Sequence, residues 1–216
     1  MNTNEIAQFP AYYEQLTPDN CAMLLIDHQV GTMAFGITDI DAVNLKNNTL
    51  WLAEQSKVFN LPVILTTSNP DGANGPLFPE LVATLPDAPI IDRVIINAWD
   101  DSKFKDAVEQ TGRKKLIMAV VTGDVCLTFP AISAVADGYD VYAVMDAAGV
   151  TNQQSMFAAM FRMSQAGVKI ANTNMVVAEL QKNWSLPTAA DTGAAYGKHV
   201  PNFGYISAHM EYLSKK

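Results

Sequence analysis

Six short apolar runs, separated by stretches of helical periodicity, constrain the fold of this chain more than any other feature of its sequence. Runs rich in Val, Ile and Leu that lack polar alternation are typical of parallel strands covered on both faces. Their alternation with helices predicts one α/β domain over residues 1–216, with a doubly wound, six-stranded parallel sheet and right-handed crossovers. The runs are 22–26, 61–67, 90–96, 115–121, 139–145 and 168–171.

The composition indicates a compact protein and argues against several classes of function. Of the 216 residues, 49% are hydrophobic and 17% are charged, which leaves apolar surface to spare and suggests a homo-oligomer. The net charge of -8 argues against a nucleic-acid partner, whose phosphates need a basic patch. We find neither an apolar signal segment in residues 1–20 nor a run near the roughly 20 residues that span a bilayer. We therefore expect a cytoplasmic protein with no membrane partner, whose two lone thiols suit a reducing compartment.

The two ends of the chain differ from its middle. Residues 1–20 are polar with turn signals and are expected to form an N-terminal arm. Residues 185–216 contain scattered Pro and Gly and are expected to form an irregular C-terminal tail that wraps the domain or lies in subunit contacts.

The stretch 120–132 joins the end of the fourth apolar run to turn residues and the start of a helical pattern. Gly123 and Asp124 are turn residues, and Pro130 fits the first turn of a helix. Cys126 is therefore expected near a helix N-terminus at the carboxyl end of a parallel strand, where ligands bind and free N–H groups favour a thiolate. The pattern is equally compatible with a buried Cys that only packs.

Charged residues also stand at or inside two other apolar runs. Asp27 follows five apolar residues, and Asp92 and Arg93 interrupt the run 90–96. With the common strand order 3-2-1-4-5-6, the first and fourth strands are neighbours, so Asp27 and Cys126 would face each other. An acid beside a thiol matches the pairing of a nucleophile with a base. A turn-capping Asp and an exposed charge pair at a sheet edge remain as alternatives.

Several longer motifs resemble the isochorismatase-like cysteine hydrolases, and within them the YcaC-type branch, over roughly residues 15–185. The motifs are LLIDHQ, NLPVILTTS, NGPLFPEL, INAWD, VCLTFPAISAVADGYDVYAVMDAAG and RMSQAG. The resemblance implies a three-layer, Rossmann-like α/β/α sandwich. It also implies an Asp–Lys–Cys triad whose Lys can be Arg in this branch, here Asp27, Arg93 and Cys126. A cis peptide is implied at Val121–Thr122, with an oxyanion bound by the N–H groups of Thr122 and Cys126.

The resemblance implies a hydrolase that cleaves the C–N bond of a small amide through a thioester on Cys126. Candidate pocket walls are His28, Phe35, Asn97, Trp99 and Phe129, although packing is the commoner role for such residues. Some members carry an Asp/His metal cluster after the second strand. This chain has no His there, so we expect no metal and no cofactor. YcaC-type relatives form large homo-oligomers, which suggests a tetramer or an octamer.

Three other functions are weighed beside this one. A catalytically silent or regulatory oligomeric member of the family would keep the fold without a reactive thiol. A metal-free acid–base hydrolase of an isochorismate-like vinyl ether would depend on Asp27 and tolerate loss of Cys126. A nucleotide-binding oxidoreductase is weakly supported, because the turn after the first apolar run lacks GxGxxG.

Overall fold

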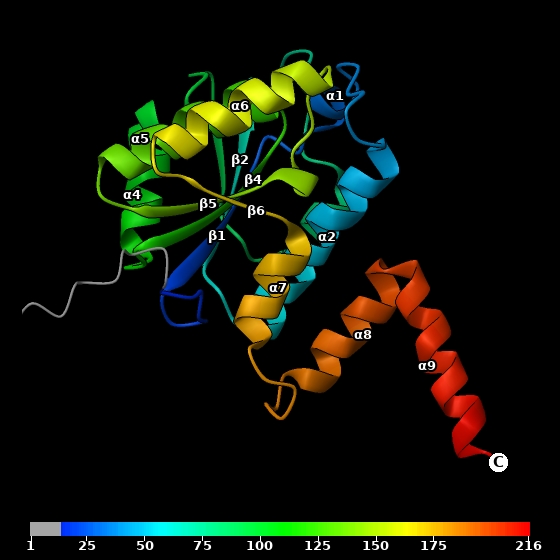
Figure 1. Ribbon diagram of the computed structural model, residues 1–216. Coiled ribbons are helices and arrows are strands. Elements are labelled where there is room, and N and C mark those ends of the chain that lie inside the picture. The colour runs from blue at the N-terminus through cyan, green and yellow to red at the C-terminus, as the bar shows by residue number, and fades with distance from the viewer. Residues whose placement is uncertain (1–13) are drawn as a thin grey trace, which may run out of the picture.

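Six parallel strands form one sheet in the order β3-β2-β1-β4-β5-β6 in the computed structural model, which describes residues 14–216. Every neighbouring pair of strands is parallel, and helices cover both faces of the sheet (Figure 1). The predicted fold class and strand order are therefore confirmed. The strands are β1 (Cys21–Ile26), β2 (Val63–Ser68), β3 (Ile90–Arg93), β4 (Lys115–Val120), β5 (Asp140–Val144) and β6 (Lys169–Ala171).

Helices connect the strands, and two of the longer ones begin at Asp caps. Asp41 accepts hydrogen bonds from the N–H groups of Val43 and Asn44, and Asp101 caps its own helix in the same way. The helical elements are α1 (Val30–Met33), α2 (Ala42–Val58), α3 (Pro79–Thr84), η2 (Ala98–Asp100), α4 (Ser102–Gln110), η3 (Gly123–Leu127), α5 (Thr128–Ala136), η4 (Met145–Ala147), α6 (Gln153–Gln165), α7 (Thr173–Gln181), α8 (Ala189–His199) and α9 (Pro201–Ser214). None of the helices in residues 14–216 is both long and apolar enough to cross a bilayer.

The two central strands bury side chains on both faces. Alternate residues of β1 enter two hydrophobic clusters: Met23 and Leu25 pack with α2, α3 and α7, whereas Leu24 and Ile26 pack with α4, α5 and α6. All residues of β1 and β4 are buried. Burying a large aliphatic side chain contributes roughly 1.5–3 kcal/mol, so these strands form the rigid frame from which the edge loops project.

The third strand is shorter than its apolar run. It ends at Arg93, and the next three residues, Val94, Ile95 and Ile96, are 77%, 42% and 61% exposed. The reason is local, because the Arg93 guanidinium donates to the carbonyl groups of Ile95 and Ile96 and so turns the chain out of the sheet.

The C-terminal segment differs from the irregular tail that its Pro and Gly content predicted. It forms two helices, α8 and α9, and Pro201 occupies the first turn of α9, where its missing N–H costs nothing. Most of the predicted N-terminal arm, residues 1–13, lies outside the described residues. Leu16, near its end, is buried and donates its N–H to Glu179 Oε2 at 2.9 Å.

Candidate active site

Three residues singled out in the sequence lie where the parallel strands β1, β3 and β4 end at the same edge of the sheet. Asp27 follows β1 directly, Arg93 is the last residue of β3, and Cys126 lies in η3, just beyond β4. Strands β1 and β4 pair along their whole length, with Ile26 opposite Val120. Ligands bind at this edge in open α/β sheets, so the fold brings the three residues to a suitable place.

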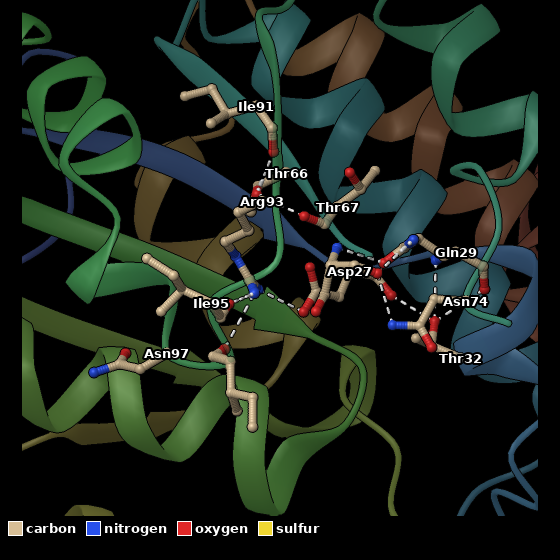
Figure 2. A network of polar contacts seen from close by, with 12 residues as sticks. Asp27, Gln29, Thr32, Thr66, Thr67, Asn74, Ile91, Arg93, Ile95 and Asn97 are labelled. Atoms are coloured by element: carbon tan, nitrogen blue, oxygen red, sulfur yellow. Dashed lines mark hydrogen bonds and ion pairs between the residues drawn. The ribbon is translucent and has the colours of Figure 1, made fainter. Parts of the chain in front are cut away.

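Asp27 and Arg93 form a buried ion pair. Arg93 Nη2 lies 2.6 Å from Asp27 Oδ2, and both side chains are fully shielded from solvent (Figure 2). The guanidinium also donates to the Ile95 carbonyl and, at 3.1 Å, to the Ile96 carbonyl. Its fork therefore joins a carboxylate to two backbone oxygens, a geometry that suits Arg better than Lys.

The backbone of Asp27 has an unusual conformation that its neighbours hold in place. Its φ is 59°, in the left-handed region that residues other than Gly seldom adopt, although Asp is among those that tolerate it. The Thr32 hydroxyl donates to the Asp27 carbonyl at 2.6 Å, and the Gln29 N–H donates to the same oxygen at 2.7 Å. These bonds fix the point from which the carboxylate projects (Figure 2).

Cys126 lies in a π-turn between β4 and α5, and its side chain is partly buried. The turn is braced by the Leu127 N–H, which donates to the Thr122 carbonyl at 3.2 Å, and by the Thr128 hydroxyl, which donates to the Gly123 carbonyl at 2.9 Å. Hydrogen bonding from the Thr122 N–H lowers the pKa of Cys126. The peptide bond between Val121 and Thr122 is cis.

The electrostatics favour a neutral thiol beside the carboxyl group. Burial, together with the negative charge of Asp27, raises the pKa of Cys126 to about 12, and the Thr122 N–H and Arg93 only partly oppose this. The thiolate expected from a helix N-terminus is therefore not the resting species, because desolvation outweighs the local dipoles.

Asp27 is a stronger base than an ordinary carboxylate. Burial raises its pKa to about 6, against the opposing effects of the Arg93 charge and of hydrogen bonding from Cys126. The second oxygen, Oδ1, is buried and accepts no regular hydrogen bond within residues 14–216. The Cys126 thiol is near enough to this carboxyl group to lower its pKa, so it is a proton donor beside the base.

His28 and Phe35 occupy different environments near the end of β1. His28 is fully buried, its Nε2 donates to the Ala147 carbonyl at 3.2 Å, and its ring meets the edge of Phe78. Burial lowers the pKa of His28 to about 4, so the ring is neutral at physiological pH. Phe35 is exposed on the segment after α1. A role in substrate binding stays a prediction for both.

The remaining predicted wall residues pack around α5. Asn97 caps η2 and donates to Ser133 Oγ at 3.2 Å, while the buried Trp99 donates its indole N–H to Asp137 Oδ2 at 2.8 Å. Phe129 lies beneath the Arg162 guanidinium, 5.3 Å from ring centroid to Cζ. These contacts give Asn97 and Trp99 a structural task, and any contact with substrate stays a prediction.

The sequence analysis did not identify the hydrogen bonds that Gln29 makes to the loop after β2. Its amide nitrogen donates to the carbonyl groups of Ser68 and Gly75, and its amide oxygen accepts the Ser68 N–H at 2.8 Å (Figure 2). Gln29 thereby ties the loop after β2 to the tip of β1, beside Asp27. The signal that the sequence offered for this role was the position of Gln29, a polar residue that closely follows the apolar run in the motif LLIDHQ.

Gly31 shows how closely that loop approaches. A Cβ at this position would lie 1.9 Å from the Ala73 carbonyl oxygen, and the Gly31 N–H donates to the Asn74 carbonyl at 2.8 Å. Within residues 14–216, no group of three or more His, Cys, Asp or Glu side chains is placed to hold a metal ion. The reactive groups that the fold brings to this edge are a carboxyl group, a guanidinium and a thiol.

Comparisons with known proteins identify the relatives of this chain. The model of the isochorismatase domain matches residues 21–175. A protein of Escherichia coli named probable hydrolase YcaC is 41% identical over 205 residues, which cover 94% of this chain and 98% of the relative. Isochorismatase domain-containing protein 2 of Danio rerio is 23% identical over 89% of this chain and 95% of its own length.

Two solved structures share the fold at higher identity. The E. coli YcaC structure, described as an octameric hydrolase of unknown specificity, superposes with a TM-score of 0.90 at 42% identity, covering 93% of this chain and 98% of that one. YcaC of Pseudomonas aeruginosa, solved with hexane-2,5-diol and covalent acrylamide, has a TM-score of 0.88 at 42% identity and covers 92% and 98%.

Proposed function

Because this chain belongs to the isochorismatase family of hydrolases, we propose that it cleaves the C–N bond of a small amide through a thioester on Cys126. The observation that carries the proposal is the arrangement of Asp27. Its carboxyl group is buried, one oxygen is paired with Arg93, the other accepts no hydrogen bond from the described residues, and the Cys126 thiol is close enough to lower the pKa of the carboxyl group. A base and a nucleophile within reach of each other meet the first requirement of covalent catalysis.

The proposed first half-reaction forms the thioester. Asp27 takes the proton of the Cys126 thiol while the sulfur attacks the acyl carbon, because the thiol is the resting species. The N–H groups of Thr122 and Cys126 stabilise the oxyanion, and a single such donor is commonly worth about 100- to 1000-fold in rate. The amine then leaves with the proton that Asp27 holds.

In the second half-reaction, Asp27 activates a water molecule that attacks the thioester carbonyl, which releases the acid and restores the thiol. Arg93 carries no proton, since its pKa lies above about 12. Its task is to keep Asp27 in place and to offset the charge that develops there. The roles of His28, Phe35, Asn97, Trp99 and Phe129 as pocket walls belong to this proposal.

Two further points from the relatives support it. The P. aeruginosa protein holds covalent acrylamide, a small electrophilic amide that reacts with thiols. The E. coli protein is described as octameric, and we extend this to propose that the present chain also forms a homo-oligomer, with an octamer as the expected size.

The experiment that tests the proposal combines a panel of small amides with intact-protein mass spectrometry. Wild-type protein should hydrolyse at least one amide and show an acyl adduct on Cys126. Cys126→Ser and Asp27→Asn should each lower the rate at least 1000-fold, as expected for residues that act as one unit. Cys21→Ser is the matched control, because Cys21 is fully buried in β1 and its sulfur donates to the Thr17 carbonyl.

Undiminished hydrolysis in Cys126→Ser would contradict the covalent route. If that variant keeps its activity while Asp27→Asn loses it, the acid–base hydrolysis of a vinyl ether becomes the better description. No hydrolysis of any substrate, together with no acyl adduct on Cys126, would instead indicate a catalytically silent member of the family.

A further inference from the structure

The last helix of the chain, α9, packs on α8 and projects away from the sheet (Figure 1, red). None of its 14 residues is buried. Isolated helices shorter than about 12–15 residues are marginally stable in water, because most helical stability in proteins comes from packing. A helix of this length with no buried face therefore lacks the contacts that would hold it in a single chain.

Four apolar residues form one stripe along α9, which we call the seam: Phe203, Ile206, Met210 and Leu213. Their spacing of three, four and three residues is the heptad pattern of a helix that packs against another apolar surface. Ile206, Met210 and Leu213 are 59%, 61% and 48% exposed. Only Phe203 has a ring partner, Tyr196 of α8, at a centroid distance of 5.4 Å.

The base of the projection is firmly attached to the domain. His199, the last residue of α8, lies 2.8 Å from Asn47 Oδ1 and 2.9 Å from Glu54 Oε2 of α2 through its two ring nitrogens. Its ring also stacks on Trp51, and Asn47 donates to the His199 carbonyl at 3.0 Å. Because α8 is fixed to α2 in this way, α9 leaves the domain from a defined position.

We infer that the seam of α9 docks on a second copy of this chain. This inference rests on the homo-oligomer that forms part of the proposed function. The domain surface offers apolar partners for such a helix, namely the exposed rings of Phe157 and Phe161, one turn apart on α6, and the exposed segment 94–96. The octameric E. coli relative is matched over 98% of its own chain.

The charge pattern of α9 distinguishes this partner from a membrane. Helices that lie on lipid surfaces are rich in Lys and Arg on their polar face. Residues 201–214 contain no Lys or Arg and one Glu, Glu211. The chain as a whole carries a net charge of -8, which opposes binding to anionic lipid.

The test places the same charge on opposite faces of α9 in the full-length protein. Molar mass is measured by size-exclusion chromatography with light scattering for wild type, Ile206→Asp, Met210→Asp and the control Ala208→Asp. Ala208 is two residues from Ile206 and lies on the face opposite the seam. Wild type and Ala208→Asp should share one oligomeric mass, whereas the two seam variants should fall at least two-fold in mass, since a carboxylate buried in an apolar contact needs a partner.

Circular dichroism and thermal unfolding should show that both seam variants keep the folded domain, whose core contains no residue of α9. A monomeric wild type, or seam variants that keep the full oligomeric mass, would overturn the inference. So would wild-type binding to phosphatidylcholine–phosphatidylserine vesicles that Ile206→Asp abolishes.

The inference and the proposed function can fail separately. An oligomer that Ile206→Asp dissociates, in a protein whose Cys126 is unreactive, would support the docking of α9 and contradict the hydrolase. A reactive Cys126 in a monomeric wild type would do the reverse.

Discussion

At the scale of single residues, the positive charge of Arg93 offsets the free-energy cost of burying the Asp27 carboxylate. Replacing Arg93 with Met keeps much of the volume and leaves Asp27 buried without its partner. Breaking a buried pair in this way typically costs about 3–5 kcal/mol, so we expect a loss of that order in the free energy of unfolding, measured in urea. The variant Arg93→Lys keeps the positive charge, but its ammonium group lacks the planar geometry with which the guanidinium binds Asp27 and two carbonyl groups at once.

Arg93→Lys is therefore expected to lose less stability than Arg93→Met and to retain measurable alkylation of Cys126 by iodoacetamide. Removing the positive charge should raise the pKa of Asp27 further, so the pH at which Cys126 alkylation increases should move upward in Arg93→Met. Equal stability of the wild type and Arg93→Met would show that the pair has no such role.

His28 makes the free energy of unfolding depend on pH, independently of the proposed reaction. Its folded pKa of about 4 lies below the ordinary value of about 6.5, so the unfolded chain binds a proton between these values and the folded chain does not. Stability from this residue is present above about pH 6.5 and is lost as the pH falls toward 4, by up to about 3 kcal/mol. His28→Leu should therefore lose less stability between pH 7.5 and pH 5 than the wild type, as measured by urea unfolding.

Asp27 acts in the opposite direction, since its raised pKa gives stability below about pH 4 that is lost as the pH rises through 6. If the free energy of unfolding of His28→Leu changed with pH as steeply as that of the wild type, His28 would not be the source of this pH dependence.

At the scale of elements, the loop after β2 is held to the tip of β1 by one amide. Gln29→Leu removes three hydrogen bonds and leaves the N–H and C=O groups of Ser68 without this partner. An unsatisfied buried polar group costs about 1–3 kcal/mol, so we expect a loss of roughly 2–4 kcal/mol in unfolding free energy and faster proteolysis within residues 69–75. Asn74→Ala, which removes one bond to the Ser68 carbonyl, is the milder comparison.

Alkylation of Cys126 provides the second measurement for Gln29→Leu. The Gln29 N–H and the Thr32 hydroxyl both bind the carbonyl of Asp27, so a displaced loop should also disturb the base. We expect slower alkylation in Gln29→Leu and a smaller effect in Asn74→Ala. If proteolysis of Gln29→Leu increased only outside residues 69–75, Gln29 would not be the residue that holds this loop in place.

The elements also show which parts of the structure the sequence could predict. Apolar runs with no polar alternation predicted the six strands, because burial on both faces leaves a clear pattern, and their order came from the common doubly wound topology. The same reasoning failed at residues 94–96, which are as apolar as a strand yet turn outward through the two carbonyl bonds of Arg93. It also failed for α8 and α9, whose Gly193, Gly197 and Pro201 resemble loop signals.

The candidate site divides in a similar way. Asp27, Arg93 and Cys126 were identified from their positions at the ends of apolar runs and from motifs. Gln29 and Thr32 were missed because their importance lies in bonds to Asp27 and to a loop 39 residues away in sequence, which no local pattern reveals. The raised pKa of Cys126 could not be predicted for a related reason, since desolvation depends on the packed fold.

At the scale of the whole molecule, Cys21 reports on the opening of the entire sheet. It is fully buried in the central strand β1, and burial raises its pKa to about 12. Reaching its sulfur requires displacing the hydrophobic cluster, including Leu16, that packs on this face of the sheet. Groups in core strands typically become exposed to solvent only when the whole domain unfolds, which costs about 5–15 kcal/mol.

We therefore expect Cys21 in the Cys126→Ser variant to be alkylated by iodoacetamide only through global unfolding. Its alkylation rate in low urea should rise with the same dependence on urea as the equilibrium unfolding transition, because both expose the same surface. In wild type, Cys126 should react in the folded state at a rate that is nearly independent of urea below that transition, since its sulfur lies in the partly buried turn at the sheet edge. A shallower urea dependence for Cys21 would mean that the packing over β1 opens locally, and a strand packed so loosely could not hold Asp27 at its tip in the geometry that the proposed reaction requires.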